Sequence, residues 1–394
     1  MSSSGLSRLL LRTTAPLHQR CFSTIATTST TTTAATLFRV KDAVDDIFKE
    51  RDCNRLVEKF KDCSKHYRFR CKHNVYDHAV RQLAAAHRFS DIEEILEEQK
   101  KHTHLAKEGF YIRLITLYGR AGMLDHAIKV FDEMPGLGSD RTVKSMNAVL
   151  TACAEGKDFD KVGVLFRELP KKLGVKPDTY SYNILARAFC EVGSVDLAFS
   201  LLGEMKSKEI NPDVITFNTL LNGFYGGDRR SEAEKVWTEM GNYGVKPDTS
   251  SFNAKIRGLV AEGKTAEAVK VLEELESKGL KPDSLSFSLL VKAHCEEGNL
   301  EEAKKVLEEL KKKDMQPNRL AYEAIIPALC AAEDINRASE LCLEVLNGNR
   351  FISVEVLQDV IDRLVNISKD MKAKRLVELG SAKSYYYSSL KMPS

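Results

Sequence analysis

The chain has 394 residues, enough for two or three ordinary domains or for one long array. Hydrophobic residues make up 43% of the chain and charged residues 29%, with both signs nearly balanced, which allows a buried core and argues against a disordered chain. No run of eighteen apolar residues occurs, so we expect no membrane-spanning helix and no membrane partner.

Residues 1–41 differ in composition from the rest. They contain no Asp or Glu, are rich in Ser and Thr, and carry several arginines. This composition is typical of an organelle transit peptide, although a plain disordered tail is the alternative. The string Arg20–Ser23 resembles a mitochondrial processing site, so we predict a transit peptide and disordered leader of a mitochondrial protein, with the plastid as alternative.

Cleavage at this string removes three arginines. The 59 basic residues would fall by three to 56, equal to the 56 acidic residues, and the mature chain would carry no formal net charge. Because sequence-independent binding to nucleic acid depends on excess positive charge, we expect any such binding to be weak.

Residues 42–72 follow as a predicted N-terminal helical cap, and after them the sequence repeats with a period close to 35 residues. A proline followed by Asp or Asn recurs at this spacing, at Pro177, Pro212, Pro247, Pro282 and Pro317. An alanine recurs in the same register, at Ala198, Ala233, Ala268, Ala303, Ala338 and Ala373. The predicted array covers 73–353, in units 73–107, 108–142, 143–178, 179–213, 214–248, 249–283, 284–318 and 319–353. We interpret 354–386 as C-terminal capping helices and 387–394 as a frayed tail.

Each unit contains two helical stripes. Apolar residues from Tyr182 to Cys190 recur every three or four positions, Gly193 interrupts the pattern, and Val195–Met205 forms a second stripe. The recurrent alanine allows the two helices to approach closely. Because one hairpin cannot bury its apolar face, the hairpins must stack into an all-α solenoid with an inner groove.

At these residues the chain resembles P-class pentatricopeptide repeat proteins of plant organelles, including short mitochondrial members. The resemblance implies a right-handed superhelical solenoid of helix-turn-helix repeats. It also implies binding of single-stranded RNA, either mRNA or rRNA, with one nucleotide per repeat.

The resemblance assigns base choice to the fifth and last residues of a repeat. The matching pairs are Asn147 with Asp178, Asn183 with Asp213, Asn218 with Asp248, Asn253 with Asp283, and Ser288 with Asn318. In this family the first four favour uracil and the fifth resembles an adenine-reading pair, which implies the core sequence U-U-U-U-A. Asn and Asp at these places are also ordinary helix-start and capping residues, so their presence indicates the repeat more firmly than base contact.

The resemblance also implies roles in base stacking and phosphate binding. The second residue of a repeat packs on base faces in many relatives, and those that suit this role here are Tyr180, Ile215, Leu285 and Leu320. Lys144 and Ser250 do not suit it. A basic residue before the inter-helix turn contacts phosphate in many relatives, and only Arg120 qualifies here. Few phosphate contacts predict a shallow salt dependence.

Two functions are compatible with this pattern. A short array with few phosphate contacts favours a subunit or associated factor of a ribonucleoprotein such as the mitochondrial ribosome, and the mixed charges of residues 304–313 suit protein neighbours. The alternative is a free factor that binds a U-rich site and acts in the stability, processing or translation of organelle transcripts.

No feature of the sequence indicates catalysis, a cofactor or a metal. The nine cysteines contain no Cys-x-x-Cys pair, and Cys190, Cys295 and Cys330 recur in register, which indicates packing. His102 and His104 lack a third ligand, and Asp359 and Asp362 are a helix-face pair. The segment 226–228 lacks the Lys-Ser/Thr of a phosphate loop. We therefore expect a protein that is not an enzyme.

Overall fold

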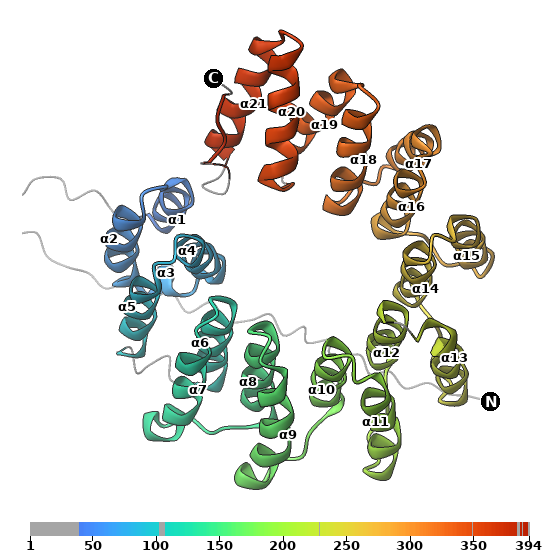
Figure 1. The fold of residues 1–394 in the computed structure, drawn as a ribbon. Helices are drawn as coiled ribbons and strands as arrows, with labels where there is room; N and C mark the ends of the chain where they lie inside the picture. Colours follow the sequence, from blue (N-terminus) through green and yellow to red (C-terminus); the bar gives the residue numbers. More distant parts are fainter. Residues whose placement is uncertain are drawn as a thin grey trace, which may run out of the picture. The chain divides into compact units, whose positions relative to one another are not determined.

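The computed structural model describes residues 39–101, 107–227, 229–348, 350–383, 387 and 389–392. The predicted transit peptide and the pair His102 and His104 lie outside these residues, apart from the last three residues of the leader. Every regular element in the described ranges is helical, and none of these helices is long and apolar enough to cross a membrane (Figure 1). The N-terminal cap consists of α1 (Val40–Lys49), α2 (Cys53–Ser64) and α3 (Tyr67–Arg70).

The helices that follow form hairpins, one within each predicted repeat and one more within the predicted capping segment 354–386. They are α4 (His73–Ala85) with α5 (Phe89–Lys100), α6 (Glu108–Arg120) with α7 (Leu124–Glu133), α8 (Val143–Glu155) with α9 (Phe159–Leu173), α10 (Thr179–Glu191) with α11 (Val195–Ser207), α12 (Val214–Gly226) with α13 (Ala233–Asn242), α14 (Thr249–Ala261) with α15 (Thr265–Ser277), α16 (Ser284–Glu296) with α17 (Leu300–Lys312), α18 (Arg319–Ala331) with α19 (Ile335–Asn347), and α20 (Val354–Asn366) with α21 (Asp370–Lys383). Short 3-10 turns, η2 (Met134–Leu137) and η3 (Arg230–Glu232), flank α7 and α13.

The turn inside most hairpins passes through the left-handed backbone region. Gly193 and Gly298 adopt φ values of 76° and 75°, and Lys157 and Glu333 adopt 59° at the equivalent positions of their hairpins. A glycine ends a helix in this conformation at little steric cost, since it has no Cβ. These repeats therefore share the same turn geometry, whichever residue occupies this position. Glycine is the residue that adopts it with the least backbone strain.

Small side chains on the second helices allow each hairpin to close. The recurrent alanines are at most 1% exposed, at Ala198, Ala233, Ala268, Ala303, Ala338 and Ala373. An aromatic residue at the fourth position of the first helices is buried to the same degree, at Tyr182, Phe217, Phe252, Phe287 and Tyr322. These residues form the contact between the helices of a hairpin and between neighbouring hairpins.

The hairpins stack through their first helices. In sequence order α6, α8, α10, α12, α14, α16 and α18 each pack against the next. Figure 1 shows these first helices on the inner side of the curve and α7, α9, α11 and α13 on its outer side. The fold is thus an all-α right-handed superhelical solenoid, with a row of first helices lining its concave face.

The C-terminal tail differs from the expectation that it is frayed. Tyr387 is fully buried and Leu390 is 6% exposed. The Tyr387 hydroxyl bonds both backbone polar groups of Ile352 at 3.0 Å. The expectation was wrong for these residues because the two apolar side chains pack into the core of the α20–α21 hairpin.

The cysteines in register have the packing role expected of them. Cys330 is buried, and Cys190 and Cys295 are half-buried among apolar neighbours. Burial raises the pKa of the Cys190 thiol to about 12 and that of Cys330 to about 11. Thiols with such pKa values remain protonated at neutral pH and are poor nucleophiles and metal ligands.

Candidate nucleic-acid interface

Four asparagines stand at the fifth position of consecutive first helices, α8, α10, α12 and α14. Each donates its Nδ2–H to the Oδ1 of the aspartate that precedes the next first helix. The Nδ2-to-Oδ1 distances are 3.0 Å for Asn147–Asp178, 3.2 Å for Asn183–Asp213, 3.0 Å for Asn218–Asp248 and 3.1 Å for Asn253–Asp283. The structure therefore joins every Asn–Asp pair that the resemblance singled out.

The same aspartates cap the first helices. Asp178 accepts a hydrogen bond from the backbone N–H of Ser181 at 2.8 Å, and the Ser181 hydroxyl accepts one from the backbone N–H of Asp178 at 3.1 Å. This capping box recurs at Asp213, Asp248 and Asp283. The interpretation of these aspartates as helix caps is confirmed.

A hydroxyl completes the network at each of these four junctions. It belongs to the third helix residue after the aspartate and lies 2.6 to 2.7 Å from the Asn Oδ1, in Ser181, Thr216, Ser251 and Ser286. Sequence reasoning missed these residues, although a Ser or Thr three positions after each aspartate is a visible signal. Because Nδ2 faces a carboxylate, the orientation of each amide is determined.

Hydrogen bonding leaves few amide atoms for a ligand. Each Asn retains one Nδ2 hydrogen without a protein acceptor, but Asn147, Asn183 and Asn253 are only 5%, 6% and 2% exposed. The Asp carboxylates are more accessible, and Asp178 lies exposed beside Asn147. Any base contact at these repeats would involve the carboxylate together with the edge of the amide.

The network sets the charge state of Asp178. Burial by itself raises the pKa of this carboxyl. Hydrogen bonds from the Ser181 N–H, the Asn147 amide and the Ser181 hydroxyl outweigh burial, so the pKa lies below its ordinary value. Asp178 is therefore negatively charged at neutral pH.

The second residue of the first helices lies near this row. Residues three apart share a helix face, so this position is adjacent to the fifth. Tyr180 and Ile215 are 52% and 56% exposed, whereas Leu285 and Leu320 are half-buried. Of the four expected stacking residues, Tyr180 and Ile215 therefore offer the most surface to a base.

The fifth expected pair is not joined. Ser288 is fully buried, and its hydroxyl donates to the carbonyl oxygen of Ser284 in its own helix at 2.6 Å. Asn318 caps α18 by accepting from the Ala321 N–H at 3.2 Å. Ser288 turns inward because its hydroxyl is too short to span the gap that Asn bridges in the other repeats.

The expected phosphate contact also has a protein partner. Arg120 is exposed at the end of α6, but its Nη1 lies 2.6 Å from Asp77 Oδ1. The junction between α6 and α8 also uses an acidic residue in a different way. Glu108 Oε1 accepts from the Thr142 N–H at 2.9 Å and from its hydroxyl at 2.7 Å, in the place that an Asn–Asp pair occupies elsewhere.

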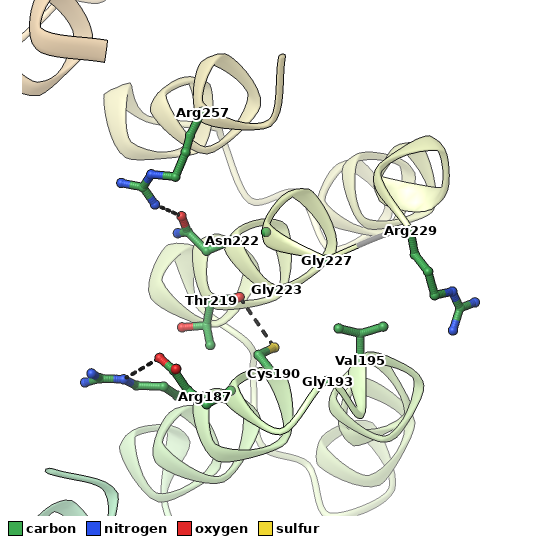
Figure 2. Close-up of a pocket in the computed structure, with 12 residues that line it drawn as sticks. Arg187, Cys190, Gly193, Val195, Thr219, Asn222, Gly223, Gly227, Arg229 and Arg257 are labelled. Atoms are coloured by element: carbon green, nitrogen blue, oxygen red, sulfur yellow. Dashed lines mark hydrogen bonds and ion pairs between the residues drawn. The ribbon is translucent and has the colours of Figure 1, made fainter. Parts of the chain in front are cut away.

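Sequence reasoning missed a row of basic and amide side chains on the same helix face. The ninth residues of α10, α12, α14 and α16 are 35 apart, namely Arg187, Asn222, Arg257 and Lys292. Arg187, Asn222 and Arg257 line a hollow of about 830 Å³ (Figure 2). Arg257 donates to the Asn222 Oδ1 at 2.5 Å, and Arg187 lies only within 3.9 Å of Glu191. The 35-residue spacing of these ninth-position residues was the signal that could have identified the row.

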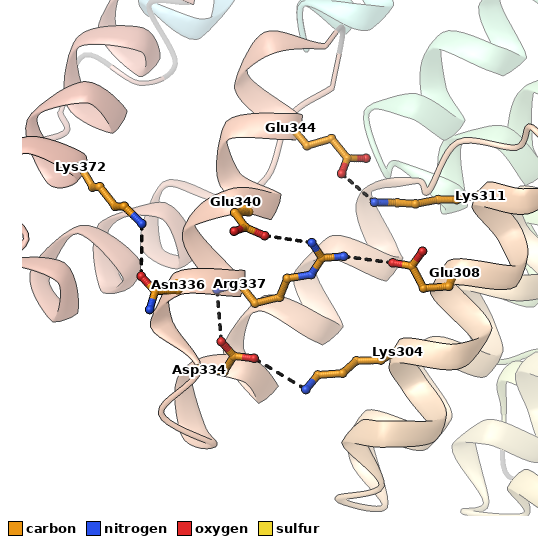
Figure 3. Close-up of polar contacts among 9 residues, drawn as sticks. All are labelled: Lys304, Glu308, Lys311, Asp334, Asn336, Arg337, Glu340, Glu344 and Lys372. Atoms are coloured by element: carbon orange, nitrogen blue, oxygen red, sulfur yellow. Dashed lines mark hydrogen bonds and ion pairs between the residues drawn. The ribbon is translucent and has the colours of Figure 1, made fainter.

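Several basic residues on the outer helices, unlike Arg187, are held in short ion pairs. Arg337 of α19 contacts Glu308 of α17 at 3.0 Å and Glu340 at 2.9 Å, and Lys311 contacts Glu344 at 2.7 Å (Figure 3). The charges of residues 304–313, expected to serve protein neighbours, are thus largely paired with other side chains of this chain. The arginines of the concave row are the better candidates for phosphate contact.

The described residues contain no group of three His, Cys, Asp or Glu side chains that could hold a metal ion. The arrangement offers amide, carboxylate, guanidinium and apolar groups in periodic order along one face. Such a face suits a linear ligand whose units repeat.

Family models match much of this array. The model described as pentatricopeptide repeat domain matches residues 164–228, the PPR repeat family matches 212–261, 247–296 and 286–331, and the PPR repeat matches 110–139. Among solved structures, the crystal structure of the pentatricopeptide repeat protein PPR10 from maize has a TM-score of 0.42 and 20% identity. That similarity covers 85% of this chain and 57% of the other.

Curated relatives are found in Arabidopsis thaliana. The chain is 47% identical over 208 residues to the small ribosomal subunit protein mS78, and the match covers 52% of each chain. It is 44% identical over 210 residues to the small ribosomal subunit protein mS79, again covering 52% of each. The chain thus matches about half the length of these relatives.

Proposed function

Since the chain belongs to the pentatricopeptide repeat family, we propose that it binds single-stranded RNA along its concave face as a non-catalytic subunit of the mitochondrial ribosome. The observation that carries RNA binding is the row of four joined Asn–Asp pairs on consecutive first helices. The similarity to two proteins named as small ribosomal subunit proteins supports the ribosomal setting. Relatives with mitochondrial names support the location.

The geometry suits a structural role in RNA binding. The asparagine amides are already bonded between repeats, so each retains little capacity to discriminate bases. Weak discrimination is sufficient for a subunit that is held in place by several neighbours, whereas a solitary factor must find one transcript among many. The base preference that we propose is U-U-U-U for the four pairs, and none is proposed at Ser288, whose hydroxyl is buried and bonded within its own helix.

Sedimentation of mitochondrial extract tests this function. The full chain should migrate with the small ribosomal subunit and should shift to lighter fractions after magnesium chelation or RNase treatment. Migration in a small complex that is unaffected by ribosome dissociation would contradict the ribosomal role.

A free RNA-binding factor is the second candidate, supported by the regular uracil-type pairs. If the protein is a free factor, RNA crosslinked to it should come from the leader of one mRNA. If it is a ribosomal subunit, the crosslinked RNA should be rRNA. Binding of a U-U-U-U-A oligonucleotide compared with one in which U is replaced by A tests the base preference separately.

A further inference from the structure

The outer surface between α9 and α11 carries an apolar patch. Val164, Val192 and Leu197 are 51%, 49% and 54% exposed, although all three are aliphatic. They line a groove of about 380 Å³, together with Phe189 and Gly163. A Cβ added at Gly163 would meet no atom within 4 Å, so the floor of the groove is open.

The same positions in other repeats are charged or polar. The counterparts of Leu197 are His126, Lys161, Glu232, Glu267, Glu302, Arg337 and Lys372. The counterparts of Val164 are Lys129, Ser200, Lys235, Lys270, Lys305, Glu340 and Arg375. The fold therefore does not require an aliphatic residue at either position. Exposed apolar side chains that interrupt a charged surface mark an interaction site.

Charges at the two ends of the groove indicate what it binds. Asp160 and Arg167 lie on the same face of α9 as Gly163 and Val164. Neither makes an ion pair within 4.0 Å among the described residues, although the charge of Arg167 helps to lower the pKa of Glu204. Asp160 and Arg167 are seven residues apart, about 10 Å along the helix. A helix lying along α9 could place a basic residue against Asp160, an apolar residue in the groove and an acidic residue against Arg167.

We propose that this groove receives an amphipathic α-helix from a protein neighbour in the ribosomal particle. The neighbouring helix inserts an aliphatic or aromatic side chain between Val164 and Leu197, with its acidic end at Arg167. RNA suits the groove less well, because most of its lining is apolar and the Asp160 carboxylate would repel a phosphate. This inference depends on the ribosomal function proposed above.

The test uses a full-length tagged double variant, Val164→Lys with Leu197→Glu, expressed in plant cells. Both replacements are residue types that other repeats carry at these positions, so folding should be preserved. The matched control, Glu267→Lys with Lys270→Glu, changes the equivalent positions on α15. Circular dichroism and U-rich oligonucleotide binding should be the same for all three proteins.

In sucrose gradients of mitochondrial extract, the Val164/Leu197 variant should show about tenfold less protein with the small subunit than the wild type, while the control should not change. A photoreactive residue at position 164 should give an adduct with a ribosomal protein that protease digests. Equal occupancy of variant and wild type, or a nuclease-sensitive adduct, would overturn the inference and leave the ribosomal function intact. Absence of the wild type from the particle would overturn both.

Discussion

The asparagine at the fifth position of a repeat is bonded to the last residue of its own repeat and to a hydroxyl of the next repeat. In Asn218 the amide faces the Asp248 carboxylate and the carbonyl faces the Ser251 hydroxyl. The residue that the family associates with base choice therefore also connects neighbouring hairpins. Substituting it would alter both RNA binding and the packing of neighbouring hairpins. Single-residue tests of RNA binding on the concave face are therefore clearer at exposed positions.

Tyr180 is such a position. We expect Tyr180→Ala to weaken binding of a U-rich oligonucleotide by about 1–3 kcal/mol, because a stacking surface is lost. Tyr180→Phe should retain affinity, and Leu137→Ala, which removes an exposed apolar residue from η2, should have no effect. Fluorescence anisotropy measures all three, and equal affinity of Tyr180→Ala and wild type would exclude stacking at this position.

The lowered pKa of Glu108 predicts that the stability of the fold depends on pH. Burial raises its pKa, but hydrogen bonds from Thr142 and Ser145 outweigh burial, so the pKa lies below the ordinary glutamate value. A carboxyl with a lowered folded pKa stabilises the protein above its unfolded pKa, and this contribution is lost as pH falls through the folded pKa. Glu108→Gln should therefore lower the urea midpoint more at pH 7 than near pH 2. An equal effect at both pH values would contradict this assignment.

At the scale of the element, the first helix of each hairpin presents the second, fifth and ninth residues on one face. The spacing of three and four residues places Tyr180, Asn183 and Arg187 on consecutive turns of α10. The groups that we propose to stack on a base, to contact a base edge and to contact phosphate thus follow one another along the helix. The second helix supplies the alanine contact and the outer surface.

The ninth-position arginines should determine part of the salt dependence. Replacing Arg187 and Arg257 with Ala should reduce the magnitude of the slope of log K against log salt by about 1.4, since each phosphate contact on a single strand contributes about 0.7. Arg337→Ala is the control, because that guanidinium is paired with Glu308 and Glu340 on the outer face. Titrations at several salt concentrations provide the slopes, and an unchanged slope would mean that these arginines do not contact phosphate.

At the scale of the whole molecule, stability is distributed along the stack. Each hairpin contacts mainly its neighbours, so a local change should affect nearby repeats and leave distant ones unaltered. The α20–α21 hairpin is also covered by residues that follow it, because Tyr387 and Leu390 pack against its core.

Tyr387→Ala should therefore loosen the last hairpin. Loss of a fully buried aromatic side chain costs about 3–5 kcal/mol, and we expect faster hydrogen exchange in α20 and α21. Peptides from α8 and α10 should exchange as in the wild type. Tyr387→Phe, which keeps the ring but loses the bonds to Ile352, should have a smaller effect. Uniform acceleration along the chain would contradict the local coupling expected of a solenoid.

The sequence by itself determined the solenoid, because period, helix spacing and turn residues are local properties that recur in every repeat. The structural role of several residues can be interpreted within one repeat. Examples are Pro212 with Asp213, the alanine of the second helix, and Gly193. The Asn–Asp pairs were also identified, although only through the resemblance to a family. The candidate site could thus be assigned to a row of helices from the sequence and this resemblance.

Only the tertiary structure decided which side chains meet across repeats. It showed that Ser251 completes the contact between Asn218 and Asp248, that Ser288 turns into its own helix and that Asp77 pairs with Arg120. These contacts join residues about 30 to 43 positions apart or depend on the rotamer of one short side chain. A periodic pattern fixes the helix face of a residue but not the partner that the neighbouring hairpin brings within hydrogen-bonding distance.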